Sequence, residues 1–494
     1  MTSFETITTF CKKKGFMYPS SDIYGGLAGI YDYGHLGTLL KRNFENTWRT
    51  FFLNLHHNYY EIETANVMHE NVFRASGHLE NFIDPIAKCS KCGNIERADH
   101  LVEKELKKRV EELTPGELTS LIKKHNITCH KCHKAFEPVT VLNMMFPVIM
   151  GVGKQTRAYL RPETAQGPYV NFKTQFELQR KKLPLGLALI GRAYRNEISP
   201  RHFTLRQREF TQSELQIFFD PDTIDEHPDF NSIKNKKLNV VLVGDRRDGV
   251  KEVKASDLNF PKFYVYHLAK IQEFYFDVLK VDKKKFRLYQ LNDKEKAFYN
   301  KYHFDVEVDL HEVGWTEVGG LHYRTNHDLE GHEKVSGESM HVTVNEKKFI
   351  PHVLELSFGV DRNTYMLVDQ NYEERDHVVL GIPSKLTPFF CAVFPLVKNK
   401  HSIVKKAKQV YGSLIGYSCF YDEVASVGRR YARADEIGIR YCITVDFDTL
   451  DDNSVTIRDR ESTKQIRIKI DTLLDTLFDL MQGKKFEDSG KIIK

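Results

Sequence analysis

The sequence predicts an α+β protein in which an antiparallel sheet flanked by helices precedes a smaller α/β unit. In residues 189–219, two stretches of mixed apolar and polar residues flank a polar loop containing Pro200, the pattern of two strands joined by a loop. An apolar stripe with a spacing of four residues indicates a helix that ends at about His56: Leu36, Leu40, Phe44, Trp48 and Phe52. After about residue 378, apolar strands alternate with helices: strands at 391–394, 442–446 and 454–457, and helices at about 401–416 and 466–482.

Length and composition are those of a globular protein with several domains. At about 150 residues per domain, 494 residues predict about three units. No stretch approaches the ~18 uncharged apolar residues of a membrane-spanning helix, and no secretory signal is visible at the N-terminus. The net charge of +5 permits an RNA partner without demonstrating one. Four of the eight cysteines form two Cys-x-x-Cys pairs and four are scattered, which predicts a reducing, cytoplasmic location.

Arginines and glutamates gather around the loop of the predicted hairpin. The arginines are at positions 192, 195, 201, 206 and 208, and the carboxylates are Glu197, Glu209 and Glu214. They form either a solvated, ion-paired surface or a phosphate clamp, because planar guanidinium groups suit anionic oxygens on a rigid platform. In a clamp, Phe210 would stack a base while Arg206 holds a distal phosphate. This pattern favours a nucleotide bound on the antiparallel sheet.

The segments before this hairpin carry weaker signals. Residues 1–20 predict a short helix, and residues 24–34 are too rich in glycine for the interior of an element. The glycine-rich segment is not a dinucleotide-binding loop, because the Gly-x-Gly-x-x-Gly spacing and a preceding strand are missing. Arg74 stands alone among small residues, and chemistry alone leaves it either structural or functional.

Two Cys-x-x-Cys pairs bracket a charged helical insertion at residues 98–125. The pairs are Cys89 with Cys92 and Cys129 with Cys132, and together they complete the ligand set of a tetrahedral four-thiolate zinc site. The alternatives are free thiols, or ligation by His130 and His133. Inside the insertion, Thr114-Pro115-Gly116-Glu117 predicts the capped start of a helix.

Further candidate residues lie on either side of a lysine-rich segment. Pro162 fixes a turn that presents Glu163 inward, although a lone glutamate in such a turn is usually a surface residue. Residues 351–362 predict a strand, a glycine turn and a helix with Arg362 at its start, where anions are favoured. The lysine-rich segment, 221–300, is expected to be an insertion with one strand near 240–243.

In the C-terminal unit, Arg429, Arg430 and Arg433 surround the aromatic Tyr431. They form either an exposed helix face or an RNA contact. The last eight residues are expected to be disordered.

The string Tyr194-Arg195-Asn196-Glu197-Ile198-Ser199-Pro200-Arg201, followed by Arg208-Glu209-Phe210, resembles motif 2 of class II aminoacyl-tRNA synthetases, in particular the dimeric type of glycyl-tRNA synthetase. Other strings resemble parts of this family in the same order along the chain. Residues 32–48 resemble its motif 1, and residues 74–85 and 160–167 resemble its amino acid site. Residues 314–325 and 351–362 resemble its ATP site with motif 3, and residues 428–438 resemble its anticodon-binding domain. His35 and Leu356 stand where the family commonly has proline.

The resemblance implies a class II catalytic domain at 1–375, with insertions at about 86–135 and 221–300, and an anticodon-binding domain at 376–494. It implies a homodimer that uses ATP and Mg²⁺ to form glycyl-adenylate and then transfers glycine to tRNA(Gly), with no editing domain. The catalytic residues would be Arg195, Arg206 and Arg362. The ATP-binding residues would be Arg195, Asn196, Glu197, Leu205, Arg206, Gln207, Arg208, Glu209, Phe210, Glu317, Val318, Gly359, Val360, Asp361 and Arg362.

Glycine offers no side chain, so its binding must use its two charges; in the resemblance, Glu163 and Glu355 bind the ammonium group and Arg74 faces the carboxylate. The glycine-binding residues would be Arg74, Glu163, Phe210, Thr211, Gln212, Ser213, Glu214, Glu355, Leu356, Ser357, Phe358 and Gly359. The tRNA-binding residues would be Arg429, Arg430 and Arg433. Arg324 also matches a site residue of the family.

Two other functions remain open from the sequence. One is a catalytically inactive synthetase-like protein that binds RNA or serves as an accessory subunit; such proteins lose the arginines of motifs 2 and 3, which this sequence retains. The other is a class IIa synthetase for a different amino acid, which Glu163 and Ser357 in their strings disfavour.

Overall fold

A nine-stranded sheet organises the larger part of the molecule. The computed structural model describes residues 3–107, 110, 113–153, 155–200 and 202–493. The strands lie in the order β13 (Lys251–Lys254), β12 (Lys237–Val241), β14 (Phe286–Gln290), β15 (Tyr302–Leu310), β16 (Gly314–Thr325), β19 (His352–Gly359), β11 (Glu209–Phe219), β10 (Leu185–Tyr194) and β3 (Tyr59–Glu61). All neighbours pair antiparallel except β3 with β10 and β12 with β14. The predicted α+β class and antiparallel sheet are confirmed.

The predicted hairpin at 189–219 is the pair β10–β11. Tyr194 lies opposite Glu209 at the end of the hairpin that carries the loop, so the two ends of the loop lie side by side. On its other edge β11 pairs with β19, where Gln212 lies opposite Gly359. The strand, glycine and helix predicted for 351–362 are β19 and α11 (Val360–Asn371). Motifs far apart in the sequence are therefore adjacent strands.

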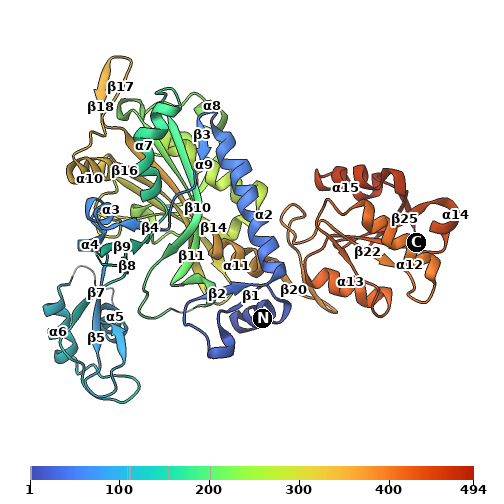
Figure 1. Cartoon of the computed structure of the whole chain (residues 1–494), viewed down its shortest axis with the longest axis horizontal. Coiled ribbons are helices and arrows are strands. Elements are labelled where there is room, and N and C mark those ends of the chain that lie inside the picture. The colour runs from blue at the N-terminus through green and yellow to red at the C-terminus, as the bar shows by residue number, and fades with distance from the viewer. Residues whose placement is uncertain (1–2, 108–109, 111–112, 154, 201, 494) are drawn as a thin grey trace.

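Side chains alternate between the two faces of this sheet, as the pleat requires. On one face, Leu215 and Ile217 of β11 enter a core with α2 (His35–Phe52), α9 (Lys262–Glu273) and α11. On the other face, Phe218 packs with α7 (Gln166–Leu178) and α10 (His327–Ser336). Figure 1 shows α2 running along the sheet. The predicted stripe helix is thus α2, followed by a 3₁₀ turn at Leu53–Leu55.

The N-terminal elements lock the beginning of α2 in place. They are α1 (Phe4–Lys14), the small antiparallel pair β1 (Met17–Pro19) and β2 (Tyr31–Tyr33), and a 3₁₀ turn at Asp22–Tyr24. A Cβ on Gly37 would lie 1.8 Å from the carbonyl oxygen of Phe16. Only glycine fits this contact, so α2 rests directly on the backbone that leads into β1.

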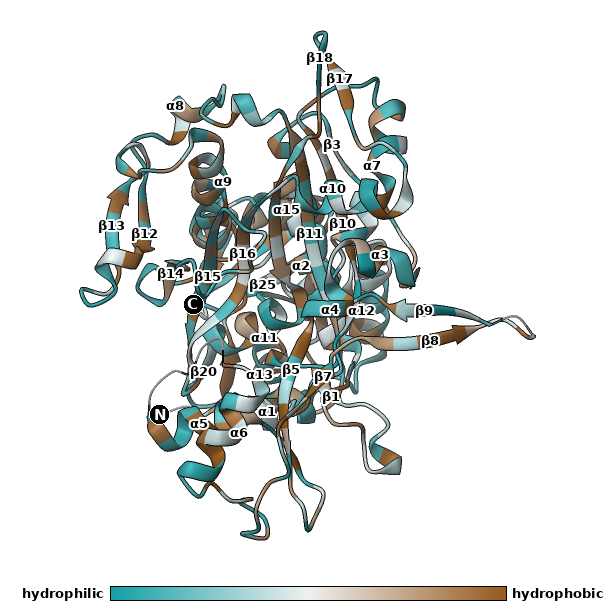
Figure 2. Ribbon diagram, turned by 90° about the vertical axis from the view of Figure 1, so that its left-hand side faces the viewer, coloured by the Kyte–Doolittle hydropathy of each residue, from teal (hydrophilic) through white to brown (hydrophobic). Residues whose placement is uncertain are grey.

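Shorter elements complete the part of the molecule around the main sheet. A three-stranded sheet contains β4 (Val67–His69), β9 (Thr156–Leu160) and β8 (Phe146–Met150), with helices α3 (Glu70–Ala75) and α4 (His78–Asn81) beside it. The hairpin of β8 and β9 projects from the body of the molecule (Figure 2). A second hairpin is formed by β17 (Val342–Val344) and β18 (Lys347–Phe349).

The cysteine-bracketed segment forms a small module with its own core. It contains β5 (Ile83–Lys88), β6 (Ile95–Arg97), α5 (Ala98–Leu106), α6 (Pro115–Lys124) and β7 (Thr140–Asn143). The predicted cap is confirmed, because Thr114 and Glu117 form a capping box at the start of α6. The module extends away from the sheet at the lower left of Figure 1.

Residues 221–300 extend the main sheet rather than standing apart from it. They supply β12, β13 and β14 at one edge, together with α8 (Phe230–Ile233) and α9. The strand expected near 240–243 is β12. Most of α9 is buried against the sheet, so this segment belongs to the same core as the predicted hairpin.

The C-terminal unit has a separate six-stranded sheet. Its strands lie in the order β23 (Cys419–Tyr421), β22 (Cys391–Pro395), β24 (Tyr441–Val445), β25 (Ser454–Asp459), β26 (Gln465–Lys469) and β27 (Lys491–Ile493). Its helices are α12 (His401–Ser413), α13 (Val427–Glu436), α14 (Asp448–Asp452) and α15 (Leu473–Met481). A short pair, β20 (Tyr372–Glu374) and β21 (Val378–Leu380), connects the two halves.

Two predictions for this unit are wrong. The helix predicted at 466–482 begins only at Leu473, because Gln465–Lys469 pairs with β25 instead. Of the last eight residues, which were expected to be disordered, 487–493 are described, and Lys491–Ile493 forms β27, which pairs with β26. None of the helices in the described part of the chain is long and apolar enough to cross a membrane.

Candidate active site

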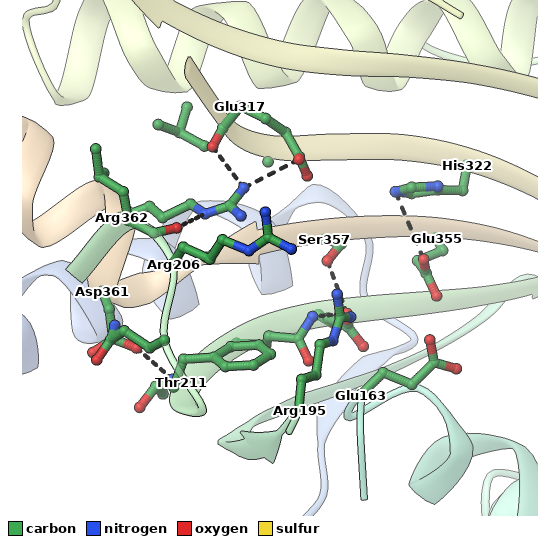
Figure 3. A pocket seen from close by; sticks show the side chains of 18 of the residues that line it. Glu163, Arg195, Arg206, Thr211, Glu317, His322, Glu355, Ser357, Asp361 and Arg362 are labelled. Carbon is green, nitrogen blue, oxygen red and sulfur yellow. Dashed lines mark hydrogen bonds and ion pairs between the residues drawn. The ribbon is translucent and has the colours of Figure 1, made fainter. Parts of the chain in front are cut away.

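A cavity of about 250 Å³ lies on the face of the main sheet away from α2. Its walls come from β11, β15, β16 and β19, from the loop between β10 and β11, and from the start of α11. Many of the predicted residues line it: Glu163, Arg195, Glu197, Leu205, Arg206, Gln207, Phe210, Thr211, Gln212, Glu214, Glu317, Val318, Glu355, Ser357, Gly359, Asp361 and Arg362. In Figure 3, Arg206 and Arg362 lie beside Glu317 at one end of the cavity, Glu163 and Glu355 lie at the other end, and Arg195 lies between them.

Arg324 organises the glutamate side. Its guanidinium is 2.9 Å from Asp328, 3.0 Å from Glu355 and 3.5 Å from Glu163. The ring of Tyr299 lies over the guanidinium, with its centre 4.4 Å away. All four charged side chains are buried. A fully desolvated arginine with several carboxylates fixes the orientation of each of them.

Glu214 is the carboxylate that Arg324 does not contact directly. It accepts hydrogen bonds from the hydroxyls of Thr164 (2.7 Å) and Ser357 (2.8 Å) and from the amide of Gln212 (2.9 Å). Burial, together with the neighbouring Glu355 and Glu163, raises the pKa of Glu214 to about 8. The carboxyl group of Glu214 is therefore protonated at neutral pH.

The other two glutamates differ in the balance of the same forces. Burial raises the pKa of Glu355 above its usual range, although Arg324 opposes this. For Glu163, burial also acts upward, but Arg324 and His78 outweigh it and hold the pKa well below the usual range. The cluster therefore has more carboxyl groups than its one arginine neutralises.

The glutamate side is suited to a small cation that donates hydrogen bonds. Among the described residues the side-chain oxygen of Gln212 has no hydrogen-bond partner, although it is buried at the cavity wall. A buried, unpaired acceptor is costly unless a ligand or water supplies a donor. An ammonium group would satisfy this acceptor and compensate the excess negative charge.

The arginine side presents three guanidinium groups. Arg195 lies between two aromatic rings, with its guanidinium 5.4 Å from the centre of Phe82 and 5.3 Å from that of Phe210. Arg206 pairs with Glu197 at 2.6 Å. Their convergence on one wall suits a ligand with several anionic groups.

Arg362 joins three parts of this wall. It donates to the carbonyl oxygen of Leu205 (3.0 Å) and to that of Glu317 (2.9 Å), and it lies 3.1 Å from the Glu317 carboxylate. Partial desolvation at the cavity wall opposes ionisation of Glu317, but Arg362 outweighs it and lowers the pKa of that carboxyl. Arg362 is thus held in place before any ligand arrives.

The structure places several predicted glycine-site residues away from the cavity. Arg74 is half exposed and pairs with Glu70 at 3.4 Å. Leu356 and Phe358 point into the core on the α2 side, because they alternate with Glu355 and Ser357 along β19. Ser213 likewise alternates with Gln212 and Glu214 along β11. These side chains do not line the cavity.

Four predicted ATP-site residues serve the surroundings of the cavity. Arg208 donates to the Glu197 carbonyl (3.0 Å), and the backbone N–H of Asn196 donates to the carbonyl of Met144 (2.8 Å). Glu209 lies 3.6 Å from Arg192. The fourth, Val360, is buried in the main core. The first three therefore fix the loop between β10 and β11 rather than the ligand.

Sequence reasoning missed one wall altogether. Tyr299, Asn300, His303 and His322 line the cavity, and the first three belong to the lysine-rich segment or the strand just after it. The alternation of His303, Asp305 and Glu307 with apolar residues along β15 carried the signal of one polar face.

Other predicted sites lie outside the cavity. One sulfur atom from each of Cys89, Cys92, Cys129 and Cys132 lies within 4.8 Å of the others, so the four cysteines form one cluster. The donor set and its spacing fit a four-thiolate zinc ion. The three arginines predicted to bind tRNA all lie on α13 (Val427–Glu436), but they differ in exposure and in partners.

On α13, Arg429 is exposed and Arg433 pairs with Asp422. Arg430 is buried and donates to the carbonyl oxygen of Leu396 (3.2 Å), so the prediction that it contacts RNA is not supported by its position.

Comparisons with known proteins agree with this geometry. Residues 146–371 match the family model described as "tRNA synthetase class II core domain (G, H, P, S and T)", and residues 391–480 match the "Anticodon binding domain". The chain is 36% identical over 569 aligned positions to the glycine–tRNA ligase of Pyrococcus horikoshii, covering 97% of this chain and 99% of that protein. It is 35% identical to that of Aeropyrum pernix, covering 99% of each, and 34% identical to that of Methanothrix thermoacetophila, covering 100% of each.

Proposed function

Because the chain belongs to the glycine–tRNA ligase family of class II aminoacyl-tRNA synthetases, we propose that the cavity on its main sheet is where glycine is activated with ATP. The enzyme attaches glycine to tRNA(Gly). The single observation that carries the assignment of the cavity is its division into an arginine wall and a buried glutamate wall. A nucleoside triphosphate fits the first wall and an amino acid ammonium group fits the second.

In the first step, the glycine carboxylate attacks the α-phosphorus of ATP. A carboxylate oxygen–phosphorus bond forms, the bond to the bridging oxygen breaks, and pyrophosphate leaves. No general base is needed, because a carboxylate is already ionised near neutral pH. The enzyme must instead align the reactants and neutralise charge on the α-phosphate. Arg195 has this role, and Phe210 beside it stacks the adenine.

Arg206 and Arg362 hold the outer phosphates of a bent triphosphate. Both are paired with carboxylates, Arg206 with Glu197 and Arg362 with Glu317. These pairs keep the guanidiniums oriented, and phosphate oxygens then take the place of the carboxylate oxygens. The class II core implies Mg²⁺; the Glu317 carboxylate would hold it, and the ion would supply further neutralisation of the phosphates.

Glycine is selected through its charge and its lack of a side chain. Glu163 and Glu355 receive the ammonium group, and Ser357 closes the space where a side chain would extend. Arg324 fixes both glutamates, so the site stays narrow. A larger amino acid would overlap with the walls of the site and is therefore excluded readily. Discrimination against a substrate that lacks one methylene is harder, because a methylene contributes only ~1–3 kcal/mol. No editing activity is required.

Three further features belong to this proposal. The cysteine cluster would hold a structural zinc ion. Arg429 and Arg433 on α13 would contact the tRNA. The chain would form a homodimer through the loop between β1 and β2, where Ile23, Tyr24 and Leu27 are 88%, 87% and 56% exposed. Exposed apolar residues in this number within one loop are typical of an interaction surface.

Amino-acid-dependent exchange between ATP and pyrophosphate, run with all twenty amino acids and without tRNA, tests the proposal. Exchange with glycine alone is expected. Glu355→Gln should raise the glycine KM far more than the ATP KM, because Glu355 faces the ammonium group only. No exchange from folded protein would instead favour the inactive synthetase-like alternative, and exchange with another amino acid would favour a different specificity.

A further inference from the structure

A buried network joins the N-terminal elements to the cavity wall. At its centre is Asp361, which is 2% exposed and immediately precedes Arg362. One carboxylate oxygen accepts a hydrogen bond from the Tyr33 hydroxyl, and the other accepts one from the backbone N–H of Thr211. A single carboxylate therefore connects β2, β11 and α11.

Lys41 completes the network from α2. Its ammonium donates to the Thr211 hydroxyl at 2.6 Å, lies 3.6 Å from the Asp361 carboxylate, and is 4.8 Å from the centre of the Tyr33 ring. Lys41 is only 9% exposed. A lysine is rarely so buried unless it is paired, and here one carboxylate and one hydroxyl satisfy it.

The two N-terminal members of the network are held rigidly. Tyr33 is the last residue of β2, and Gly34 follows it at the N-cap of α2. A Cβ on Gly34 would lie 2.2 Å from the carbonyl oxygen of Gly15. Because Gly34 and Gly37 both press on backbone, the hydroxyl of Tyr33 and the ammonium of Lys41 have fixed starting points.

The network ends on the residues that contact ATP in the proposed function. Thr211, whose N–H donates to Asp361 and whose hydroxyl accepts from Lys41, directly follows Phe210. Asp361 directly precedes Arg362. A second link lies nearby, since the backbone N–H of Arg208 donates to the Gly29 carbonyl at 2.7 Å. The β1–β2 region therefore braces both the adenine-stacking strand and the phosphate-binding helix.

We propose that Tyr33 and Lys41 are positioning residues for adenylate formation, acting through Asp361 on Phe210 and Arg362. This rests on the proposed ATP site. The two side chains touch neither substrate; they set the separation between the adenine-stacking ring and the outer phosphate. In-line transfer is sensitive to that separation, because a misplacement of 1 Å can lower a rate by about 10²-fold.

Two single variants test the proposal: Tyr33→Phe removes one hydroxyl, and Lys41→Met removes the charge while keeping the length. Glycine-dependent ATP–pyrophosphate exchange should lose about 10- to 100-fold in kcat/KM for ATP, with the glycine KM within about twofold of the parent protein. The double variant should lose less than the product of the single effects, because both act through Asp361. Lys41→Arg should recover part of the activity.

Two control variants separate this role from general damage. Tyr18→Phe changes a partly exposed tyrosine on β1, and Arg42→Met changes the exposed neighbour of Lys41; both should leave exchange unchanged. Near-ultraviolet circular dichroism and thermal unfolding establish folding of each variant. The inference is overturned if folded Tyr33→Phe and Lys41→Met keep the parent kcat/KM for ATP. It is also overturned if kcat/KM falls equally for ATP and for glycine. An inactive parent protein would instead refute the proposed function itself.

Discussion

At the scale of single residues, the glutamate wall shows how one residue type adopts different protonation states within one cavity. Glu163 is ionised because Arg324 and His78 outweigh its burial, whereas Glu214 lacks a direct cationic partner and has a pKa of about 8. The hydroxyl donors around Glu214 orient it without neutralising it. The cavity thus holds a proton that an incoming cation can displace.

This proton predicts a pH dependence of glycine binding. Below pH 8 the carboxyl group of Glu214 is protonated. The ammonium group of glycine favours loss of this proton, so glycine binding releases it. The glycine KM should therefore fall as the pH rises from 6.5 to 8, by up to about tenfold per pH unit, and level off above pH 8. Exchange kinetics at saturating ATP measure this slope.

The matched variant is Glu214→Gln, which keeps the shape and removes the titration. Its glycine KM should vary little between pH 6.5 and 8. If the variant keeps the slope of the parent protein, another group is responsible for it.

The residue scale also marks the limit of reading motifs from sequence. The string around Glu355 correctly located a cavity strand, but it could not say which residues of the strand face inward. Glu355 and Ser357 line the cavity, whereas Leu356 and Phe358 enter the core. Period-two alternation would have separated them. Arg74 differs, because its direction depends on α3 and not on the sheet pleat.

At the scale of elements, α13 separates an exposed from a buried arginine. The sequence left Arg429, Arg430 and Arg433 as either an exposed helix face or an RNA contact. It did not reveal that Arg430 turns inward to the carbonyls of Pro395 and Leu396. Long arginine side chains reach such acceptors only once the neighbouring strand is in place, so tertiary contact decides their role.

We expect Arg430→Ala and Arg429→Ala to behave oppositely. The first leaves buried carbonyls without donors and should cost about 1–3 kcal/mol of stability in the C-terminal unit. The second should leave stability unchanged and weaken tRNA binding. Calorimetry and tRNA filter binding measure the two effects, and exchange without tRNA should be unaffected by Arg429→Ala. Equal effects of both variants on tRNA affinity, with no change in unfolding temperature, would contradict this assignment.

The cysteine module is the second element-scale case. Its core is small, formed around Ala87, Val102, Leu118 and the two buried cysteines of the cluster, and so small a module usually needs a metal or cross-links. We expect about one zinc ion per chain by elemental analysis, and its loss in Cys92→Ser. The metal-free module should be cleaved within 98–125 by limited proteolysis.

Cys419→Ser, outside the cluster, is the control and should retain zinc and protease resistance. Suppose that the purified protein contains no metal and its four cluster thiols react freely, yet the module still resists protease. This result would show that packing alone stabilises the module.

Residues 221–300 show why composition misleads at this scale. Their lysines suggested an insertion, yet the segment's apolar residues complete the core of the main sheet. Lys251 and Lys254 lie on β13 (Lys251–Lys254), the strand at the edge of that sheet. A short edge strand with lysines is protected from pairing with other chains. Strand order is not encoded locally, so the sequence could not place this segment beside β15.

At the scale of the whole molecule, the N-terminal elements connect an exposed apolar loop, the cavity and the C-terminal unit. The loop between β1 and β2 contacts Arg208 and Pro200 of the ATP-site loop, and Lys14 of α1 pairs with Glu436 of α13. A partner chain that covers this loop would therefore stabilise the positions of ATP-binding residues.

This arrangement predicts that dimerisation and glycine activation are lost together. The double variant Ile23→Asp, Tyr24→Asp places two charges in the proposed interface, where desolvation without a partner charge is unfavourable. Sedimentation should show a shift from dimer to monomer, and exchange should fall by about tenfold or more, since Arg208 and Phe210 lose their bracing. Val152→Asp, at the fully exposed tip of the β8–β9 hairpin, adds one such charge elsewhere and should change neither property. If the parent protein is monomeric, the proposed interface is wrong. If the double variant is folded and monomeric but has full exchange activity, the interface stands and its coupling to the cavity is refuted.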